Sequence, residues 1–101
     1  MGGALLGAAG ADADWHRATA SVFFLYGTQL ACGGTLNAGT MGVAHRTLPC
    51  GARISLRRAG RTVTVPVVDR GPFVGGREFD LTPAAAARLK ITGVVDVDWH
   101  R

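Results

Sequence analysis

The chain has 101 residues, of which 48% are apolar, and its eleven basic and seven acidic side chains give a net charge of +4. This length is enough for one domain with a single core and excludes a second. The basic residues are spread along the chain, whereas nucleic-acid binding needs a dense basic stripe with stacking aromatics. A mildly basic domain suits an anionic polymer such as a bacterial cell wall, although scattered charge is also typical of a solvated surface.

Residues 1–18 are predicted to be a flexible segment that precedes a domain formed by residues 19–101. Residues 1–13 are rich in Gly, Ala and Leu and end in Ala11-Asp12-Ala13, which resembles the end of a secretion signal with a small-x-small cleavage site. The positively charged N-terminal region that such a signal needs is missing, so the alternative is a flexible segment rich in Gly and Ala. No other apolar run approaches the length of a membrane span.

The first predicted strand covers residues 19–26, an apolar run that is expected to be buried and that Gly27 ends. Residues 29–51 are then rich in Gly, Thr and Asn without a sustained period, which predicts a long irregular loop. A loop of this kind is unusual in a small domain and tends to have a function.

Cys32 and Cys50 lie near the two ends of this loop. A metal or redox site is one interpretation, but the chain has no Cys-x-x-Cys, and His45 is the only imidazole nearby. We therefore expect no metal and no other cofactor. We expect a disulfide instead, because a small domain with few large aromatics needs a covalent staple. Such a bond stabilises a fold by about 3 kcal/mol and indicates an oxidising, extracytoplasmic compartment.

Residues 53–56 and 61–68 are predicted to form a hairpin around Ala59-Gly60. Asp69 follows directly and Gly71-Pro72 ends the strand, so a carboxylate lies at the lip of a sheet, where rigid support meets solvent access. One interpretation is that Asp69 only caps a turn by accepting from nearby backbone amides. A histidine in the long loop and a second acidic cluster further along the chain favour a role in chemistry.

A short helix is predicted over residues 82–90, because Thr82 is a good N-cap and Pro83 suits the first helical position. Residues 94–99 form a closing strand whose two aspartates are expected to face solvent. Many short strands, one helix and long connections predict a mainly β fold, a closed or nearly closed small barrel.

Three stretches together resemble the rare lipoprotein A family, over roughly residues 20–99. They are Ala31-Cys32-Gly33 with Leu36 and Gly42-Val43-Ala44-His45-Arg46-Thr47-Leu48-Pro49-Cys50-Gly51; Val68-Asp69-Arg70-Gly71-Pro72-Phe73; and Phe79-Asp80-Leu81-Thr82. The resemblance implies a six-stranded double-psi β-barrel, and the two cysteines are similar to those of secreted members. More distantly, the chain is similar to expansin and barwin-like domains, which bind or loosen polysaccharides.

The family's characterised enzymes are lytic transglycosylases, which cut the MurNAc–GlcNAc bond of peptidoglycan and leave a 1,6-anhydro sugar. Residue by residue, the resemblance makes Asp69 the central acid, His45 the active-site histidine and Asp80 the aspartate before the helix. Asp80 also matches the key acid of expansins. The enzymes carry a further Glu eleven residues before the histidine, where this chain has Gly34. This departure removes a carboxylate that would help to protonate the leaving oxygen or shape the groove.

Glycosidic cleavage needs an acid for the leaving oxygen and stabilisation of an oxocarbenium-like transition state. In a lytic reaction the sugar's own 6-hydroxyl is the nucleophile, so one residue, here Asp69, can act first as acid and then as base. To serve as the acid near neutrality, Asp69 must be held protonated by desolvation or by a neighbouring carboxylate such as Asp80. His45 is expected to orient Asp69 or to bind substrate, and the alternative is a structural histidine that fixes the long loop.

Four further side chains are predicted to contact substrate: Arg70, Tyr26, Phe73 and Glu78. Arg70 would bind sugar or peptide carboxylates bidentately, or else brace the end of the sheet. Tyr26 and Phe73 would stack on sugar rings, unless Phe73 belongs to the core. Glu78, the only glutamate, is a candidate replacement for the missing acid.

The leading hypothesis is a secreted, cell-wall-associated lytic transglycosylase, a monomer that acts on peptidoglycan, binds no nucleic acid and does not span a membrane. The alternative is a non-catalytic, expansin-like polysaccharide-binding module, which Gly34 favours. A third interpretation is a small secreted inhibitor or interaction protein built on the same barrel.

Overall fold

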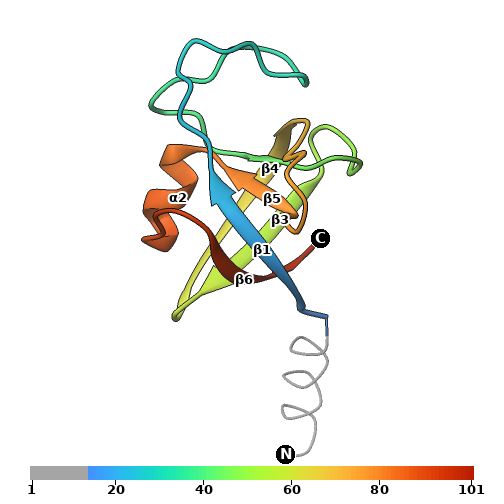
Figure 1. The fold of residues 1–101 in the computed structure, drawn as a ribbon, viewed down its shortest axis with the longest axis vertical. Coiled ribbons are helices and arrows are strands. Elements are labelled where there is room, and N and C mark those ends of the chain that lie inside the picture. The colour runs from blue at the N-terminus through green and yellow to red at the C-terminus, as the bar shows by residue number, and fades with distance from the viewer. Residues whose placement is uncertain (1–13) are drawn as a thin grey trace, which may run out of the picture.

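The computed structural model describes residues 14–101, and the signal-like segment predicted at residues 1–13 lies outside them. The elements follow the chain as β1 (His16–Val22), β2 (Val43–Ala44), β3 (Arg53–Arg58), β4 (Arg61–Asp69), β5 (Phe79–Leu81), α2 (Pro83–Leu89) and β6 (Val95–His100). The strands join in the order β1-β5-β2-β4-β3-β6, and the sheet closes on itself as a barrel (Figure 1). The predicted six-stranded, mainly β barrel with one short helix is confirmed for this part of the chain.

Two of the strand pairs, β1–β5 and β2–β4, are parallel, and the other four are antiparallel. Parallel neighbours cannot be joined by a tight turn and need longer connections, so a large part of this small domain is loop. The longest connection between the described strands, residues 23–42, rises above the barrel in Figure 1. The strand order and the two parallel pairs are consistent with the double-psi barrel.

The barrel interior is filled by apolar side chains that alternate along the strands. In β4 every second residue is buried, namely Val63, Val65 and Val67, and this is the period-two pattern of a half-buried strand. The helix α2 packs against β4 and β5 and adds its buried face to the same core. Removal of this apolar surface from water is the main driving force for the fold. The other fully buried large side chains of the barrel are Val43, Ile54, Leu56, Phe79, Leu81 and Val97.

The strands β3 and β4 form the predicted hairpin and pair along the whole of β3. Both turn residues have positive φ, 52° at Ala59 and 80° at Gly60. A two-residue type I′ turn requires this conformation at both positions, because its twist matches that of the flanking strands.

The helix α2 begins as predicted, with Thr82 as its N-cap and proline at the first position. The hydroxyl of Thr82 accepts hydrogen bonds from the Ala85 N–H at 3.3 Å and from the Gly42 N–H at 3.1 Å, and the Thr82 N–H donates to the Gly42 carbonyl at 3.0 Å. One buried threonine therefore fixes both the start of the helix and the entry of the chain into β2. Within the described residues no helix is long and apolar enough to cross a membrane.

The predicted boundaries of the first strand are wrong at both ends. β1 begins at His16, inside the segment predicted to be flexible, because its residues pair with β6 from that point. It ends at Val22, where its other neighbour β5 also ends. The barrel therefore begins before residue 19, and the closing strand is Val95–His100 rather than 94–99. Three apolar residues predicted to be buried in this strand are 61%, 74% and 56% exposed: Phe24, Leu25 and Tyr26.

The predicted disulfide between Cys32 and Cys50 is present, with a Cα–Cα distance of 5.6 Å. Both ends of the enclosed loop are also bonded to β4. The Cys32 N–H donates to the Val68 carbonyl at 3.1 Å, and the Gly51 N–H donates to the Val67 carbonyl at 2.9 Å. The long loop is thus attached to the strand that carries Asp69.

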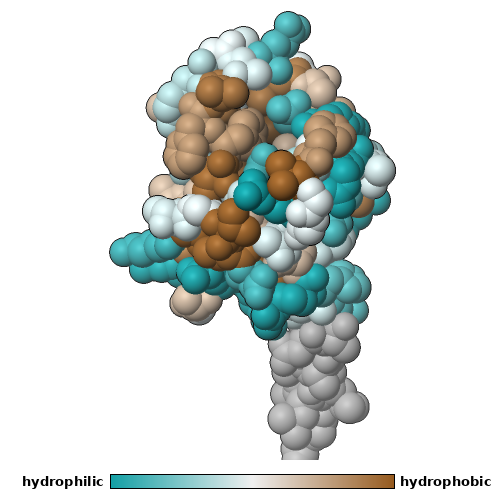
Figure 2. All heavy atoms as spheres, viewed as in Figure 1, coloured by the Kyte–Doolittle hydropathy of each residue, from teal (hydrophilic) through white to brown (hydrophobic). Residues whose placement is uncertain are grey.

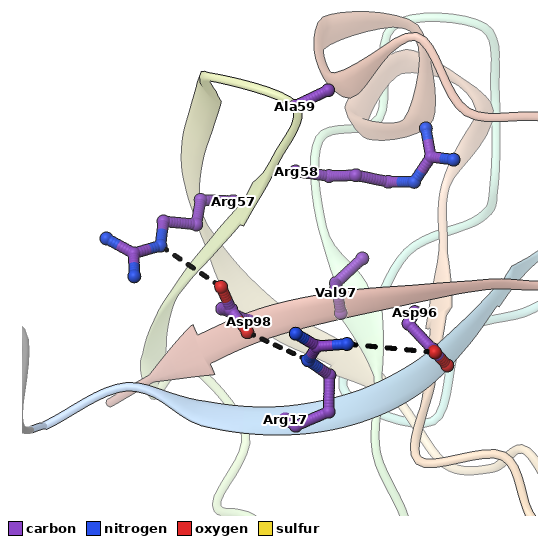
Figure 3. A pocket seen from close by; sticks show the side chains of 7 residues that line it. All are labelled: Arg17, Arg57, Arg58, Ala59, Asp96, Val97 and Asp98. Atoms are coloured by element: carbon purple, nitrogen blue, oxygen red, sulfur yellow. Dashed lines mark hydrogen bonds and ion pairs between the residues drawn. The ribbon is translucent and has the colours of Figure 1, made fainter.

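An ion-pair network covers the outer face of β1, β6 and β3 (Figure 3). Asp98 accepts from Arg17 Nε at 3.1 Å and from Arg57 Nε at 3.3 Å, and Arg17 also lies 3.8 Å from Asp96. The Arg57 guanidinium lies 4.1 Å from the centre of the Trp15 ring. Desolvation acts to raise the pKa of Asp98, but the hydrogen bonds from Arg57 and Arg17 outweigh it, so this pKa lies below its ordinary value of 3.8.

Replacement of both cysteines by serine is expected to lower the free energy of unfolding by about 3 kcal/mol, because the unfolded chain is no longer constrained across this loop. For a domain of this size the melting temperature should fall by roughly 12–24 °C, which calorimetry can measure. Reduction of the wild type should have a similar effect and should leave the double variant unchanged. Equal melting temperatures for oxidised and reduced wild type would contradict the prediction.

Asp98→Asn should weaken the acid dependence of stability. The pKa of Asp98 is lower in the folded than in the unfolded chain, so its charge stabilises the fold above the ordinary value of 3.8 and the contribution is lost as the pH falls through the folded value. In urea denaturation the variant should be less stable than the wild type near neutrality and lose less stability on acidification. Asp14→Asn, an exposed control, should keep the wild-type pH dependence. Parallel curves for Asp98→Asn and wild type would rule this out.

Candidate active site

Four side chains from neighbouring strands form a row across the barrel wall, in the order Ser21, Asp80, Ala44 and Asp69. The register pairs Ser21 with Asp80, Asp80 with Ala44, and Ala44 with Asp69. Residues that lie opposite each other on neighbouring strands present their side chains to the same face. Neighbouring strands lie about 4.8 Å apart, so the Cα atoms of Asp69 and Asp80 are about 10 Å apart with a single alanine between them.

An irregularity in the pairing of β2 with β4 brings Asp69 into this row. Val43 pairs with Val67, yet the next residue, Ala44, pairs with Asp69 and not with Val68. In a regular strand Asp69 would continue the buried series of every second residue in β4. Irregularities of this kind re-aim side chains and are frequent next to active sites.

The carboxylates of Asp69 and Asp80 each accept a hydrogen bond from the protein through one oxygen. Asp69 Oδ1 accepts from the Ala31 N–H at 2.8 Å, and Asp80 Oδ1 accepts from the hydroxyl of Ser21. The second oxygen of each has no partner within residues 14–101, which leaves it for a substrate. The partner of Asp69 is a distant loop rather than a nearby turn, so the simple turn cap considered from the sequence does not describe this residue.

The ring of His45 is buried and bonded at both nitrogens. Nδ1 accepts from the N–H groups of Thr47 and Leu48, both at 3.1 Å, so the proton of the neutral ring lies on Nε2. Nε2 then donates to Glu78 Oε2 at 2.7 Å, and the ring packs 5.0 Å from that of Phe79. The side chain of His45 therefore orients Glu78 rather than Asp69, and only its backbone N–H reaches Asp69, at the carbonyl oxygen.

Arg70 has the contacts of a brace. Its Nη1 donates to the carbonyls of His45 and Leu48 at 3.1 and 2.7 Å, and its Nη2 lies 3.6 Å from Cys50 Sγ. These bonds hold the segment after β2 against the end of β4. The guanidinium is thus occupied by the protein itself, which favours the bracing role over the binding of a substrate carboxylate.

Sequence reasoning missed Arg46, which lies beside the site. Its Nη1 donates to the Pro72 carbonyl at 2.9 Å and to the Arg77 carbonyl at 2.6 Å, and it lines a cavity of about 240 Å³. The signal was available, because Arg46 directly follows His45. Ser21 was missed as well, but its role follows only from the strand register.

Two of the predicted stacking residues, Tyr26 and Phe73, are 56% and 78% exposed. Phe73 is therefore not part of the core. They lie on the loops that follow β1 and β4. On the face drawn in Figure 2, apolar surface appears on the loop region above the barrel and over α2, while the lower end of the barrel is hydrophilic. Exposed apolar side chains that gather in a contiguous patch mark binding surfaces, whereas single scattered ones do not.

Gly34, which stands where the resemblance places a glutamate, lies in an exposed part of the long loop with φ of 79°. No atom lies within 4 Å of the position that a Cβ would occupy there. The space next to Gly34 is therefore open. Across the described part of the chain, no group of three or more His, Cys, Asp or Glu side chains is placed to hold a metal ion.

Comparison with known proteins shows the family to which the chain belongs. The family described as "Lytic transglycolase" matches residues 16–99. The chain is 43% identical over 68 residues to the probable endolytic peptidoglycan transglycosylase RlpA of Synechocystis sp.. This alignment covers 65% of this chain and 21% of that protein. It is 37% identical over 91 residues to the endolytic peptidoglycan transglycosylase RlpA of Pseudomonas aeruginosa, covering 73% and 27%.

The chain thus spans about a quarter of the length of these relatives. Among solved structures, the Streptomyces papain inhibitor is similar, with a TM-score of 0.61 at 25% identity over 86% of this chain and 94% of the inhibitor. The inhibitor therefore has a similar overall fold. The match to the family covers residues 16–99, which is nearly all of the described barrel. The chain belongs to the lytic transglycolase family.

Proposed function

We propose that this chain is the glycan-cleaving barrel of a lytic transglycosylase that acts on peptidoglycan. The observation that carries the proposal is the pair Asp69 and Asp80, which stand on either side of Ala44 with one oxygen each left for a substrate. The family match and the activity stated in the names of the relatives support it.

In the proposed reaction Asp69 gives a proton to the glycosidic oxygen as the bond from that oxygen to C1 of the sugar breaks. The carboxylate of Asp80, on the other side of Ala44, stabilises the positive charge that develops on the sugar. The 6-hydroxyl of the same sugar then attacks C1 while its proton passes back to Asp69. The products are a 1,6-anhydro end and a free hydroxyl on the departing strand, and Asp69 is ready for another cycle.

His45 and Glu78 act together as a positioning pair in this proposal. Both nitrogens of His45 are already bonded, so its ring serves to hold Glu78 rather than to transfer a proton. Glu78 Oε1 has no partner within the described chain and can accept from a sugar hydroxyl. Glu78 therefore stays the first alternative to Asp69 as the acid.

We further propose that the protein works outside the cytoplasm. Disulfides persist in oxidising compartments, and Cys32 and Cys50 are joined. The relatives are named for action on peptidoglycan, a polymer of the cell wall, which lies outside the cytoplasm.

A second candidate function is a non-catalytic polysaccharide-binding module. It is favoured by Gly34, because glycine supplies no carboxylate at the position where the resemblance places a glutamate. The two candidates share the exposed aromatics and differ in chemistry, so product analysis separates them.

Asp69→Asn should fold with a near-unchanged melting temperature and bind glycan strands, yet release at least about 10²-fold fewer anhydro-ended products than wild type. The amide keeps an oxygen that accepts from the Ala31 N–H but has no proton to donate at the required acidity. Mass spectrometry of wall glycans after incubation measures the products. Asp96→Asn, on the outer face of β6, is the matched control and should keep full activity.

Equal product release by Asp69→Asn and wild type would show that Asp69 is not the acid, and Glu78→Gln would then be the variant to compare. If the wild type releases no product while wild type and variant bind glycan equally, the enzymatic proposal fails and the binding module takes its place.

Tyr26→Ala should weaken glycan binding about three- to tenfold, which is the effect of losing one aromatic contact. Because Tyr26 is 56% exposed, the melting temperature should not change. Val94→Ala, at another apolar position that is 52% exposed, is the control and should bind like the wild type. Sedimentation with insoluble glycan gives the affinities, and equal values for both variants would remove Tyr26 from the binding surface.

A further inference from the structure

We propose that the pocket lined by Arg46, Phe73, Val74, Gly75 and Gly76 binds a carboxylate that a sugar carries on a short apolar arm. The pocket has a volume of about 240 Å³. This inference rests on the proposed function and adds to it the feature of the glycan that is recognised.

Arg46 is fixed in place before any ligand arrives. Its Nη1 bonds the carbonyls of Pro72 and Arg77, on the two sides of the loop between β4 and β5. Nε and Nη2 have no partner among residues 14–101, so one edge of the guanidinium is left for a ligand. Two parallel N–H donors match the two oxygens of a carboxylate, and an arginine that is already ordered loses little entropy on binding.

The rest of the pocket is suited to a short apolar group with a negative end. Phe73 and Val74 are 78% and 55% exposed and supply apolar surface. The N–H groups of Gly75 and Gly76 donate to no atom of the described chain, which leaves two more donors near Arg46. The pocket therefore combines a guanidinium group, two backbone N–H donors and an apolar wall.

The pocket adjoins the proposed catalytic residues along the chain. Arg46 follows His45, Arg77 precedes Glu78, and the loop that carries Phe73 starts directly after Asp69. The bond from Arg46 to the Arg77 carbonyl joins these two segments across space. The pocket and the residues proposed for catalysis are therefore carried by the same two segments of the chain.

The other arginines of the cavities and of the site are less suited to this task. The cavity of about 140 Å³ in Figure 3 is lined by arginines and also by Asp96 and Asp98. Both aspartates pair with Arg17, so the cavity already contains carboxylates of the protein. Arg70 also donates to two backbone carbonyls through Nη1, as Arg46 does, but its Nη2 lies 3.6 Å from Cys50 Sγ and it lines neither of the two cavities. The pocket at Arg46 has no carboxylate in its lining.

Peptidoglycan offers two carboxylates of this chemistry. One is the lactyl group on the muramic acid ring, and the other is the end of a short peptide attached to that lactyl group. Polymers built from neutral sugars alone have neither. The pocket would let the barrel distinguish the wall polymer from neutral glycans with similar backbones.

The test is a titration of the wild-type protein, followed by NMR, with three forms of the disaccharide GlcNAc–MurNAc. The lactyl carboxylate is free in the first, converted to a methylamide in the second and extended by one alanine in the third. The free acid should bind at least about tenfold more tightly than the methylamide and should shift the amide signals of Gly75 and Gly76. If the alanine form binds like the free acid, the peptide carboxylate is also accepted, and if it binds like the methylamide, only the lactyl group is recognised.

Arg46→Gln should abolish the preference for the free acid, and Arg46→Lys should keep part of it, because lysine has the charge without the paired donors. Arg88→Gln, on the exposed side of α2, is the control and should keep the full preference. If Arg46→Gln does not fold, the wild-type titration and Arg46→Lys still decide.

Equal binding of acid and methylamide by the wild type would overturn the inference, as would an unchanged preference in Arg46→Gln. Glycan cleavage by the wild type is measured separately. Preference for the acid without anhydro products would leave the pocket standing and refute the enzyme, and products without preference would do the reverse.

Discussion

The site depends on how closely β2 approaches β4. The approach is possible because residue 42 is glycine, since a Cβ there would lie 2.6 Å from a methyl carbon of Val68 and 3.1 Å from the Pro66 carbonyl oxygen. Two hydrogen bonds with Thr82 hold Gly42 in this position. With β2 in place the barrel closes, and the irregular register turns Asp69 out of the core and into line with Ala44. A side chain at position 42 would therefore disturb packing and chemistry together.

Stability and chemistry also share contacts in the loop that the disulfide encloses. Ordering a loop without regular structure costs conformational entropy, which the covalent bond and the donors of Arg70 offset here. The N–H that holds Asp69 belongs to Ala31, next to Cys32. The position of the proposed acid is thus set by residues that do not touch a substrate, as a preorganised site requires.

Much of the fold could be predicted from local signals, such as the alternation in β4, the turn at Ala59-Gly60 and the cap at Thr82. The error at the first strand has a physical cause, because apolar periodicity cannot distinguish a buried strand from an apolar loop that stays exposed. The partner of His45 could not be predicted, since its contact with Glu78 depends on the pairing of β2 with β5. Arg46 and Arg70 each follow a predicted catalytic residue and each donate to two backbone carbonyls, and only the folded structure shows that Arg46 also lines a pocket.

Closure of the barrel has a consequence for how this protein meets its surroundings. A sheet with free edges offers unpaired backbone groups to any passing strand and invites aggregation. In the described chain each of the six strands has a neighbour on both sides, so the backbone has no such edge. The exposed large apolar side chains lie instead mostly on loops, among them Phe24 and Phe73, and in our proposal such side chains contact the glycan. These can be selective for the shape and chemistry of a ligand, whereas an open strand edge would accept almost any peptide.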